Sequence, residues 1–347
     1  RAATFLPLID LLRSYFGIVG GDDERRIRER VIGKLLALDE EFRTISAPLL
    51  TLLGATPDDD TFAALDPAQR RRMTLDACRT LLLREADLQP LVVVFEDLHW
   101  VDAETLAFLD LMVGSVGHSR MLLLFNYRPE FTDPWIGRSR YGHTRIDPLR
   151  EASSDELLAD LLGEGEGLKE LRQLLMARTE GYPFYIEETV QSLVEEGVLG
   201  GEPGARRLTV PVQQIRVPPS VQSVIAARID RLSPEGKLLL QAASVVGKDF
   251  ELDLLTEICD LDEADVQDQL ALLQNGEFIY ETRLFPEPEY TFKHALTHQV
   301  AYESLLRDRR RDKHVEILEA IERLHSDRLD DRLERLVHHG LAGGAWD

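Results

Sequence analysis

The sequence contains few of the features that mark secreted or membrane proteins. Its 347 residues include two cysteines, Cys78 and Cys259, which lie far apart within apolar helical patterns. Buried free thiols are therefore expected rather than a disulfide or a metal site. No apolar run approaches the ~18 residues of a membrane span, and no charged-then-apolar signal segment opens the chain. We expect a cytoplasmic protein that makes no membrane contact.

Basic residues are also scarce. The chain has 40 Lys and Arg against 62 Asp and Glu, a formal net charge of −22. A nucleic-acid-binding surface must neutralise phosphates, so this excess of acid disfavours nucleic acid as a partner. The one basic run, residues 307–313, contains Asp308 and Asp312 and is expected to be a solvated helix face.

A third absence concerns phosphate binding. The phosphate loop GxxxxGK[ST] does not occur in the 347 residues. The two Gly-Lys pairs, at residues 33–34 and 247–248, have Arg28 and Ala242 where the motif needs its first glycine, and neither is followed by Ser or Thr. Both pairs are expected to be ordinary helix or loop residues.

The stretch from Leu91 to Asp102 is the most informative part of the chain. Five apolar residues, 91–95, precede Glu96 and Asp97, a pattern that predicts a strand buried on both faces and ending in two carboxylates. Open α/β sheets bind ligands at this end of their strands. For a Mg-nucleotide, one carboxylate would hold the metal and the other would orient the attacking water; we assign Glu96 to the metal and Asp97 to the water. The alternative is an acid that merely caps the next helix.

A second buried strand is predicted at Met121–Tyr127. It runs into Asn126-Tyr127-Arg128-Pro129-Glu130, which places Arg128 where a guanidinium can register the γ-phosphate of a nucleotide. The alternative for Arg128 is a surface arginine that happens to precede a proline. A last short strand is predicted at 143–149.

The rest of the chain is predicted to be largely helical. Helices are expected near residues 5–15, 23–38, 67–86 and 103–113, and Ser153 opens a capping box that starts a helical segment reaching residue 197. A glycine- and proline-rich hairpin and hinge follows to Pro219. Beyond it the expected elements are helices at 220–232, 233–246 and 262–274, strands at 278–284 and 290–293, and helix again from Tyr302 to Trp346.

Residues 91–102 resemble the Walker B segment of STAND-class signalling ATPases, in which an acid pair runs into Leu-His-Trp, here residues 98–100. Residues 127–130 also match. Residues 180–188 resemble the Gly-x-Pro element of that class, and residues 292–296 resemble its Met-His-Asp element.

The resemblance implies an incomplete parallel α/β nucleotide-binding sheet followed by an all-helical lid, a winged helix and C-terminal helices. The expected domain boundaries are 1–150 for the α/β part, 151–200 for the lid, 201–219 for the hinge, 220–300 for the winged helix and 301–347 for the start of a helical-repeat array.

The resemblance also implies roles for two further residues. Pro183, at the first turn of a helix, would form an apolar wall against adenine; the alternative is a glycine cap followed by a helix-starting proline. His294 would contact ADP in the inactive state. His294 and His298 have the spacing of half a zinc site, but no third ligand is evident. In this class a phosphate loop precedes a segment like residues 5–12, so we expect the loop to lie upstream of residue 1.

The function implied is an ATP/ADP-dependent switch, with Mg²⁺, in a multidomain bacterial signalling or transcription regulator. Its partners would be the nucleotide, a cyclase or LuxR-type effector domain on the same chain, and proteins bound through the C-terminal helices. The rival is a nucleotide-independent interaction scaffold of the same architecture. A DNA-binding winged helix is less favoured. Residues 262–269, the first part of its expected recognition helix, are acidic and include no Lys or Arg.

Overall fold

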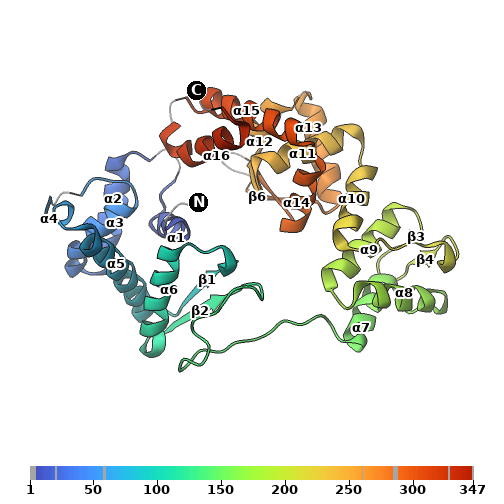
Figure 1. The fold of residues 1–347 in the computed structure, drawn as a ribbon, viewed down its shortest axis with the longest axis horizontal. Coiled ribbons are helices and arrows are strands. Elements are labelled where there is room, and N and C mark those ends of the chain that lie inside the picture. Colours follow the sequence, from blue (N-terminus) through green and yellow to red (C-terminus); the bar gives the residue numbers. More distant parts are fainter. Residues whose placement is uncertain are drawn as a thin grey trace. The chain divides into compact units, whose positions relative to one another are not determined.

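The computed structural model describes residues 5–19, 22–57, 60–259, 261–283, 288–326 and 329–345. The chain forms two compact units, Arg1–Arg145 and Ile146–Asp347 (Figure 1). The described residues are mostly helical, with one two-stranded parallel sheet and two small antiparallel sheets. Among these residues, no helix combines the length and the apolar character needed to cross a bilayer.

The first unit consists of helices around a short sheet. Its elements are α1 (Leu6–Phe16), α2 (Glu24–Leu38), α3 (Ser46–Leu52), α4 (Asp60–Ala63), α5 (Pro67–Leu88), β1 (Leu91–Phe95), α6 (Ala103–Ser115) and β2 (Met121–Phe125), with the 3₁₀ turns η1 (Glu40–Ile45), η2 (Leu98–Trp100) and η3 (Val116–His118). The predicted helices and the first two strands are confirmed, although the second strand ends at Phe125 and not at Tyr127. The starts of α2, α5 and α6 are explained by N-capping, since the side chains of Asp23, Asp66 and Asp102 accept hydrogen bonds from N–H groups in the first turns.

The strands β1 and β2 pair in parallel from Leu91↔Met121 to Phe95↔Phe125. The prediction that β1 is buried on both faces is wrong. Val93 and Phe95 are buried in the core of the unit, whereas Val92 and Val94 are 59% and 47% exposed. Alternate residues of a strand point to opposite faces, and the described elements cover only one of them.

The strand predicted at 143–149 is not formed. These residues have extended or irregular backbone and pair with neither β1 nor β2. The N–H of Leu149 instead donates to the carbonyl oxygen of Gly181, 2.7 Å away.

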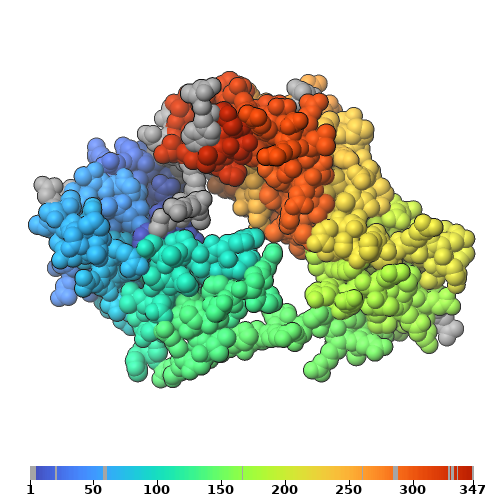
Figure 2. Space-filling model, viewed as in Figure 1, coloured from blue at the N-terminus to red at the C-terminus, as the bar shows by residue number. Residues whose placement is uncertain are grey.

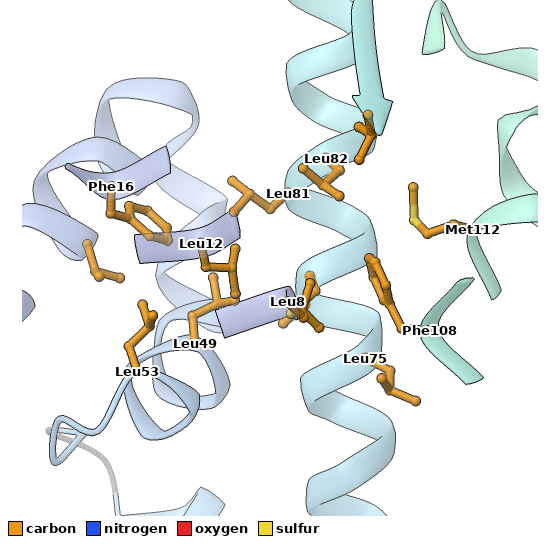
Figure 3. Close-up of a cluster of buried hydrophobic side chains, with 14 of the residues drawn as sticks. Leu8, Leu12, Phe16, Leu49, Leu53, Leu75, Leu81, Leu82, Phe108 and Met112 are labelled. Atoms are coloured by element: carbon orange, nitrogen blue, oxygen red, sulfur yellow. The ribbon is translucent and has the colours of Figure 1, made fainter. Parts of the chain in front are cut away.

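The core of the first unit is built where α1, α3, α5 and α6 meet (Figure 3). In this view the side chains of α1 and α3 approach α5 from one side, and Phe108 and Met112 approach it from the other. Leu8, Leu12 and Phe16 follow each other at helical spacing, so one face of α1 is buried. Each such apolar side chain contributes about 1.5–3 kcal/mol on burial. This core fixes the position of β1, whose Phe95 belongs to it.

The second unit holds the remaining elements. Its helices are α7 (Glu151–Leu162), α8 (Lys169–Thr179), α9 (Pro183–Glu195), α10 (Val221–Arg231), α11 (Pro234–Val246), α12 (Leu252–Ile258), α13 (Glu263–Asn275), α14 (Ala295–Ser304), α15 (Arg307–Leu324) and α16 (Leu333–Gly343). The strands are β3 (Leu199–Gly200), β4 (Arg207–Leu208), β5 (Asp249–Glu251), β6 (Ile279–Arg283) and β7 (Glu289–Phe292), and the 3₁₀ turns are η4 (Glu166–Leu168), η5 (Val212–Gln214) and η6 (Leu329–Arg332).

Most helices and strands predicted for this unit are confirmed, and the predicted hairpin is the antiparallel pair β3 and β4. The helix predicted from Tyr302 onward is instead divided into the end of α14, α15 and α16. The predicted start of a helix at Ser153 is wrong. Helix α7 begins at Glu151, and its N-cap residue, Arg150, makes no capping side-chain bond. Ser154 is buried instead, with its hydroxyl 3.5 Å from the carbonyl oxygen of Leu149.

Strand β5 and helix α12 were not predicted. They lie between α11 and α13, and β5 completes an antiparallel sheet of order β5-β7-β6. Leu284 and Trp346, which end two of the predicted elements, lie outside the described residues.

Two cores stabilise the second unit, one formed by α7, α8 and α9 and the other by α10 to α15 with the three-stranded sheet. Figure 2 shows the C-terminal helices (red) packed directly on the orange and yellow segments that precede them. Ile317, Ala320 and Ile321 of α15 belong to the larger core. The C-terminal helices are therefore an integral part of this unit.

Candidate functional site

The acid pair follows directly on β1, at the C-terminal edge of the parallel sheet. Both Glu96 and Asp97 are exposed. Asp97 has φ 55° and ψ 43°, the left-handed conformation, which Asp adopts more readily than most residues but which still costs energy. Such conformations recur at binding and catalytic sites. Both carboxylates therefore lie in solvent, just beyond the end of β1.

Asn126, directly after β2, holds this turn in place. The N–H of Asp97 donates to Oδ1 of Asn126 over 2.7 Å, and the N–H of Leu98 donates to the Asn126 carbonyl oxygen over 3.0 Å. The N–H of Asn126 donates in turn to the Phe95 carbonyl oxygen, 3.2 Å away. These bonds continue the connection between the two strands beyond the ladder itself. Sequence reasoning did not assign a role to Asn126, although its position at the end of a strand was a signal.

Arg128 lies at the same edge. The register places the ends of β1 and β2 side by side, and Arg128 follows β2 by three residues. Its guanidinium carbon is 5.5 Å from the ring centroid of Trp100, which is in η2 and 66% exposed. An exposed cation–π contact of this kind contributes about 0.5–1 kcal/mol. Glu96, Asp97 and Arg128 thus follow the ends of two neighbouring strands at one edge of the sheet.

His99 is a further member of this edge that sequence reasoning did not single out. Its side chain is 4% exposed, and its Nδ1 is 3.9 Å from Oδ1 of Asp97. Neither ring nitrogen has a hydrogen-bond partner among the described residues. The ring lies 4.5 Å from that of Trp100.

The helix after the acid pair is capped by Asp102. Its Oδ1 accepts from the N–H groups of Glu104 and Thr105, both at 3.0 Å, and from the N–H of Phe5 at 3.3 Å. Burial would raise the pKa of Asp102, but these bonds and one from the Thr105 hydroxyl lower it below its usual value. Asp97 makes no capping side-chain bond. Capping of α6 therefore does not explain the acid pair.

A second cluster lies in the other unit, where Pro183 is the first residue of α9 and is exposed. It follows Gly181, which has φ 77°. A Cβ atom at Gly181 would lie 2.3 Å from the carbonyl oxygen of Leu149, so only glycine fits this turn. The Gly-x-Pro element is thereby packed against the segment that leads into α7.

His294 lies against this element. It is the residue before α14, and its ring is 4.3 Å from that of Phe184, the neighbour of Pro183. Burial, followed by the charge of Lys293, lowers the pKa of His294, which favours a neutral imidazole. His298 is engaged elsewhere, with Nε2 2.9 Å from the carbonyl oxygen of Ser244. The Gly-x-Pro element and His294 therefore lie next to each other in the second unit.

The five predicted site residues thus form two groups. Glu96, Asp97 and Arg128 lie at the sheet edge of the first unit, and Pro183 and His294 lie on either side of the ring contact between Phe184 and His294 in the second. The first group offers carboxylate oxygens, the ligands preferred by Mg²⁺, together with a guanidinium that can pair with phosphate.

Comparison with known proteins adds one relative. No protein-family model matches the chain. The chain is 27% identical over 238 residues to an uncharacterized protein of Rhizobium meliloti (strain 1021), a match that covers 67% of this chain and 22% of that protein. The matched part is thus about a fifth of the relative's length.

Proposed function

We propose that this chain is part of an ATP/ADP-dependent conformational switch of the STAND class, in a multidomain bacterial signalling or transcription regulator. The observation that carries the proposal is the edge of the parallel sheet. There an exposed acid pair and Arg128 follow neighbouring strands, and the helix cap that would explain the acids is supplied by Asp102.

Each residue at this edge has a defined task in nucleotide hydrolysis. Glu96 would hold Mg²⁺, which neutralises charge on the β- and γ-phosphates. Asp97 orients and polarises the attacking water. Arg128 pairs with the γ-phosphate and so distinguishes ATP from ADP. The hydrogen bond from Asp97 to Asn126 keeps the acid turn fixed against the neighbouring strand, so that little reorganisation is needed for the reaction.

The second unit supplies the moving part of the switch. The order α11-β5-α12-α13-β6-β7 and the sheet order β5-β7-β6 support a winged helix, and α7 to α9 support a helical lid before it. The first turn of α13 carries Glu263 and Asp265, which disfavours DNA as its partner.

The two nucleotide states would differ in their contacts with this unit. Pro183 and His294 hold ADP in the inactive state, and exchange for ATP releases the effector domain. Differential affinity for the two nucleotides drives the population shift, and hydrolysis reverses it.

Hydrolysis by the full-length natural protein tests the assignment. Asp97→Asn should retain nucleotide binding but slow hydrolysis by about 10²-fold or more. Glu96→Gln should weaken Mg²⁺-dependent binding. Glu130→Gln removes a carboxylate from the same region and should leave both unchanged. Loss of turnover in Glu96→Gln with normal turnover in Asp97→Asn would reverse the two roles.

The competing function is a nucleotide-independent interaction scaffold. It is favoured by one observation, the absence of GxxxxGK[ST] from these 347 residues. Calorimetric titration of the full-length protein with ADP and Mg-ATP separates the two functions. Mg-ATP binding that weakens in Arg128→Ala supports the switch. Absence of binding to either nucleotide supports the scaffold.

A further inference from the structure

Three histidines of the C-terminal helices converge outside the site described above. His314 is in α15, and His338 and His339 are in α16. One ring nitrogen from each lies within 4.8 Å of those of the other two. His314 and His339 are buried, at 2% and 1% exposure, and His338 is exposed. Figure 1 shows α15 and α16 side by side, which is what brings residues 314 and 338–339 together.

The two buried rings face each other through the same atom type. Nδ1 of His314 is 2.8 Å from Nδ1 of His339, so one proton at most lies between them. The other nitrogen of His314, Nε2, is 3.1 Å from the hydroxyl of Tyr302. When Nε2–H donates to Tyr302, Nδ1 presents its lone pair towards His339. A partner on the far ring nitrogen is the usual means by which a metal-binding histidine is oriented.

Burial favours the neutral form of the two buried rings. Burial, followed by the charges of His338 and Arg310, lowers the pKa of His314 to about 4. Burial, followed by the charges of His314, His338 and Arg335, lowers the pKa of His339 to about 3.

We propose that His314, His338 and His339 form a transition-metal site that takes Zn²⁺. Three imidazoles without a carboxylate suit zinc and disfavour Mg²⁺ and Ca²⁺. At Zn–N distances of about 2.0–2.1 Å, tetrahedral ligand nitrogens lie about 3.3 Å apart. The two Nδ1 atoms would therefore separate by roughly half an ångström as the ion takes the place of the shared proton.

Three protein ligands leave a fourth position open, as in zinc sites that bind water or a substrate. His314 also lines a cavity of about 610 Å³, together with Tyr302, Arg307 and Arg310. This cavity gives water or a small anion access to the cluster.

The role of His338 separates metal binding from simple packing. The hydrogen-bonded chain from Tyr302 through His314 to His339 accounts for the two buried rings without any ion. His338 is outside that chain and exposed, so packing does not require it. A metal site does require it as the third ligand.

Zinc binding by the untagged, metal-stripped chain tests the proposal, with bound zinc measured by equilibrium dialysis and atomic spectroscopy. One zinc per chain is expected in the wild type. His338→Ala, at an exposed position that should fold normally, is expected to bind at least 10-fold more weakly. Tyr302→Phe, which removes the partner of His314, should weaken binding about 10- to 100-fold. His118→Ala, at an exposed histidine of the first unit, should match the wild type.

Circular dichroism confirms that each variant is folded before zinc is added. Absence of zinc from the folded wild type, or equal zinc binding by the wild type and His338→Ala, would overturn the proposal. The two buried rings, His314 and His339, would then serve only to pack α15 against α16.

Discussion

The backbone N–H of Asp97 donates a hydrogen bond to Oδ1 of Asn126, 2.7 Å away. This bond joins the residue that should orient water to the end of the neighbouring strand. Asp97 has left-handed backbone angles, so its turn is held by specific contacts and not by the intrinsic preference of the chain. The position of its carboxylate therefore depends on Asn126.

Asn126→Ala removes the acceptor of this bond. We expect the free energy of unfolding of the first unit to fall by about 0.5–1.5 kcal/mol, the net contribution of one such bond. Urea unfolding followed by tryptophan fluorescence measures it. Asn126→Asp keeps an acceptor oxygen in the same position but adds a negative charge. At high salt, which screens this charge, the variant should retain most of the wild-type free energy of unfolding. If alanine is as stable as the wild type, the bond does not support the turn.

Asp97→Gly separates the strain at this position from its chemistry. Glycine adopts φ 55° without steric cost, so stability should stay equal or rise by up to about 1 kcal/mol. Hydrolysis by the full-length protein should nevertheless be lost, because the carboxylate is gone. Thermal unfolding and a phosphate-release assay on the same preparation check the two halves of this prediction.

Arg140→Gly is the matched control for that substitution. Arg140 has φ 64° in the same unit, so glycine should relieve strain there as well, while hydrolysis stays normal. A marked loss of stability in Asp97→Gly would show that the Asp97 side chain holds the fold and would weaken the case for its catalytic role.

Local patterns in the sequence sufficed for much of the fold. Asp66 and Pro67 mark the start of α5, and the apolar run at 91–95 marks β1, because capping and strand formation depend on neighbouring residues. Burial of a strand depends on what covers it, however. The exposure of Val92 and Val94 could therefore not be predicted from the apolar run.

The same distinction applies to the site. Glu96 and Asp97 could be found from sequence, since they directly follow an apolar strand. The contact of Asn126 with Asp97 required the register of two parallel strands. The meeting of His314 with His339 depends on how two helices are rotated against each other, which the 24 residues between them do not reveal.

Arg228 is the centre of a buried ionic network that joins α9 and α10. It is 2% exposed and donates to Glu188 over 2.5 Å, to Glu195 over 2.6 Å and to the Gly276 carbonyl oxygen over 2.5 Å. Burial raises the pKa of Glu188, although the charge of Arg228 opposes this effect. Arg228→Met would leave Glu188 buried without its cation. We expect the second unit to lose about 3–5 kcal/mol of stability in urea unfolding.

Two further variants identify the cause of that loss. Arg231→Ala removes a neighbouring, partly exposed arginine that also pairs with Glu195 and should cost less than about 1 kcal/mol. Arg228→Met combined with Glu188→Met removes both charges and should recover part of the lost stability. If the double variant is no more stable than Arg228→Met, lost packing and not the unpaired Glu188 carboxylate explains the effect.

The ionised Asp133 stabilises the first unit, and this stabilisation is lost at acid pH. Its carboxylate accepts hydrogen bonds from the hydroxyls of Tyr127 and Tyr141, at 2.6 and 2.5 Å, and from the N–H of Trp135 at 2.8 Å. Burial would raise the pKa of Asp133, but these bonds and the charge of His143 lower it below its usual value. The folded state therefore binds the Asp133 proton more weakly than the unfolded state does.

The direction of the pH effect follows from that difference. Stability from Asp133 is fully present above the pKa of an unfolded aspartate, about 3.9, and is lost as the pH falls through the lower folded value. Asp133→Asn cannot ionise, so its stability should change less between pH 5 and pH 2 than that of the wild type. Urea unfolding across this range, followed by the fluorescence of buried Trp135, measures both slopes. Parallel slopes for Asp133→Asn and the wild type would show that the two tyrosines do not stabilise the ionised form of Asp133.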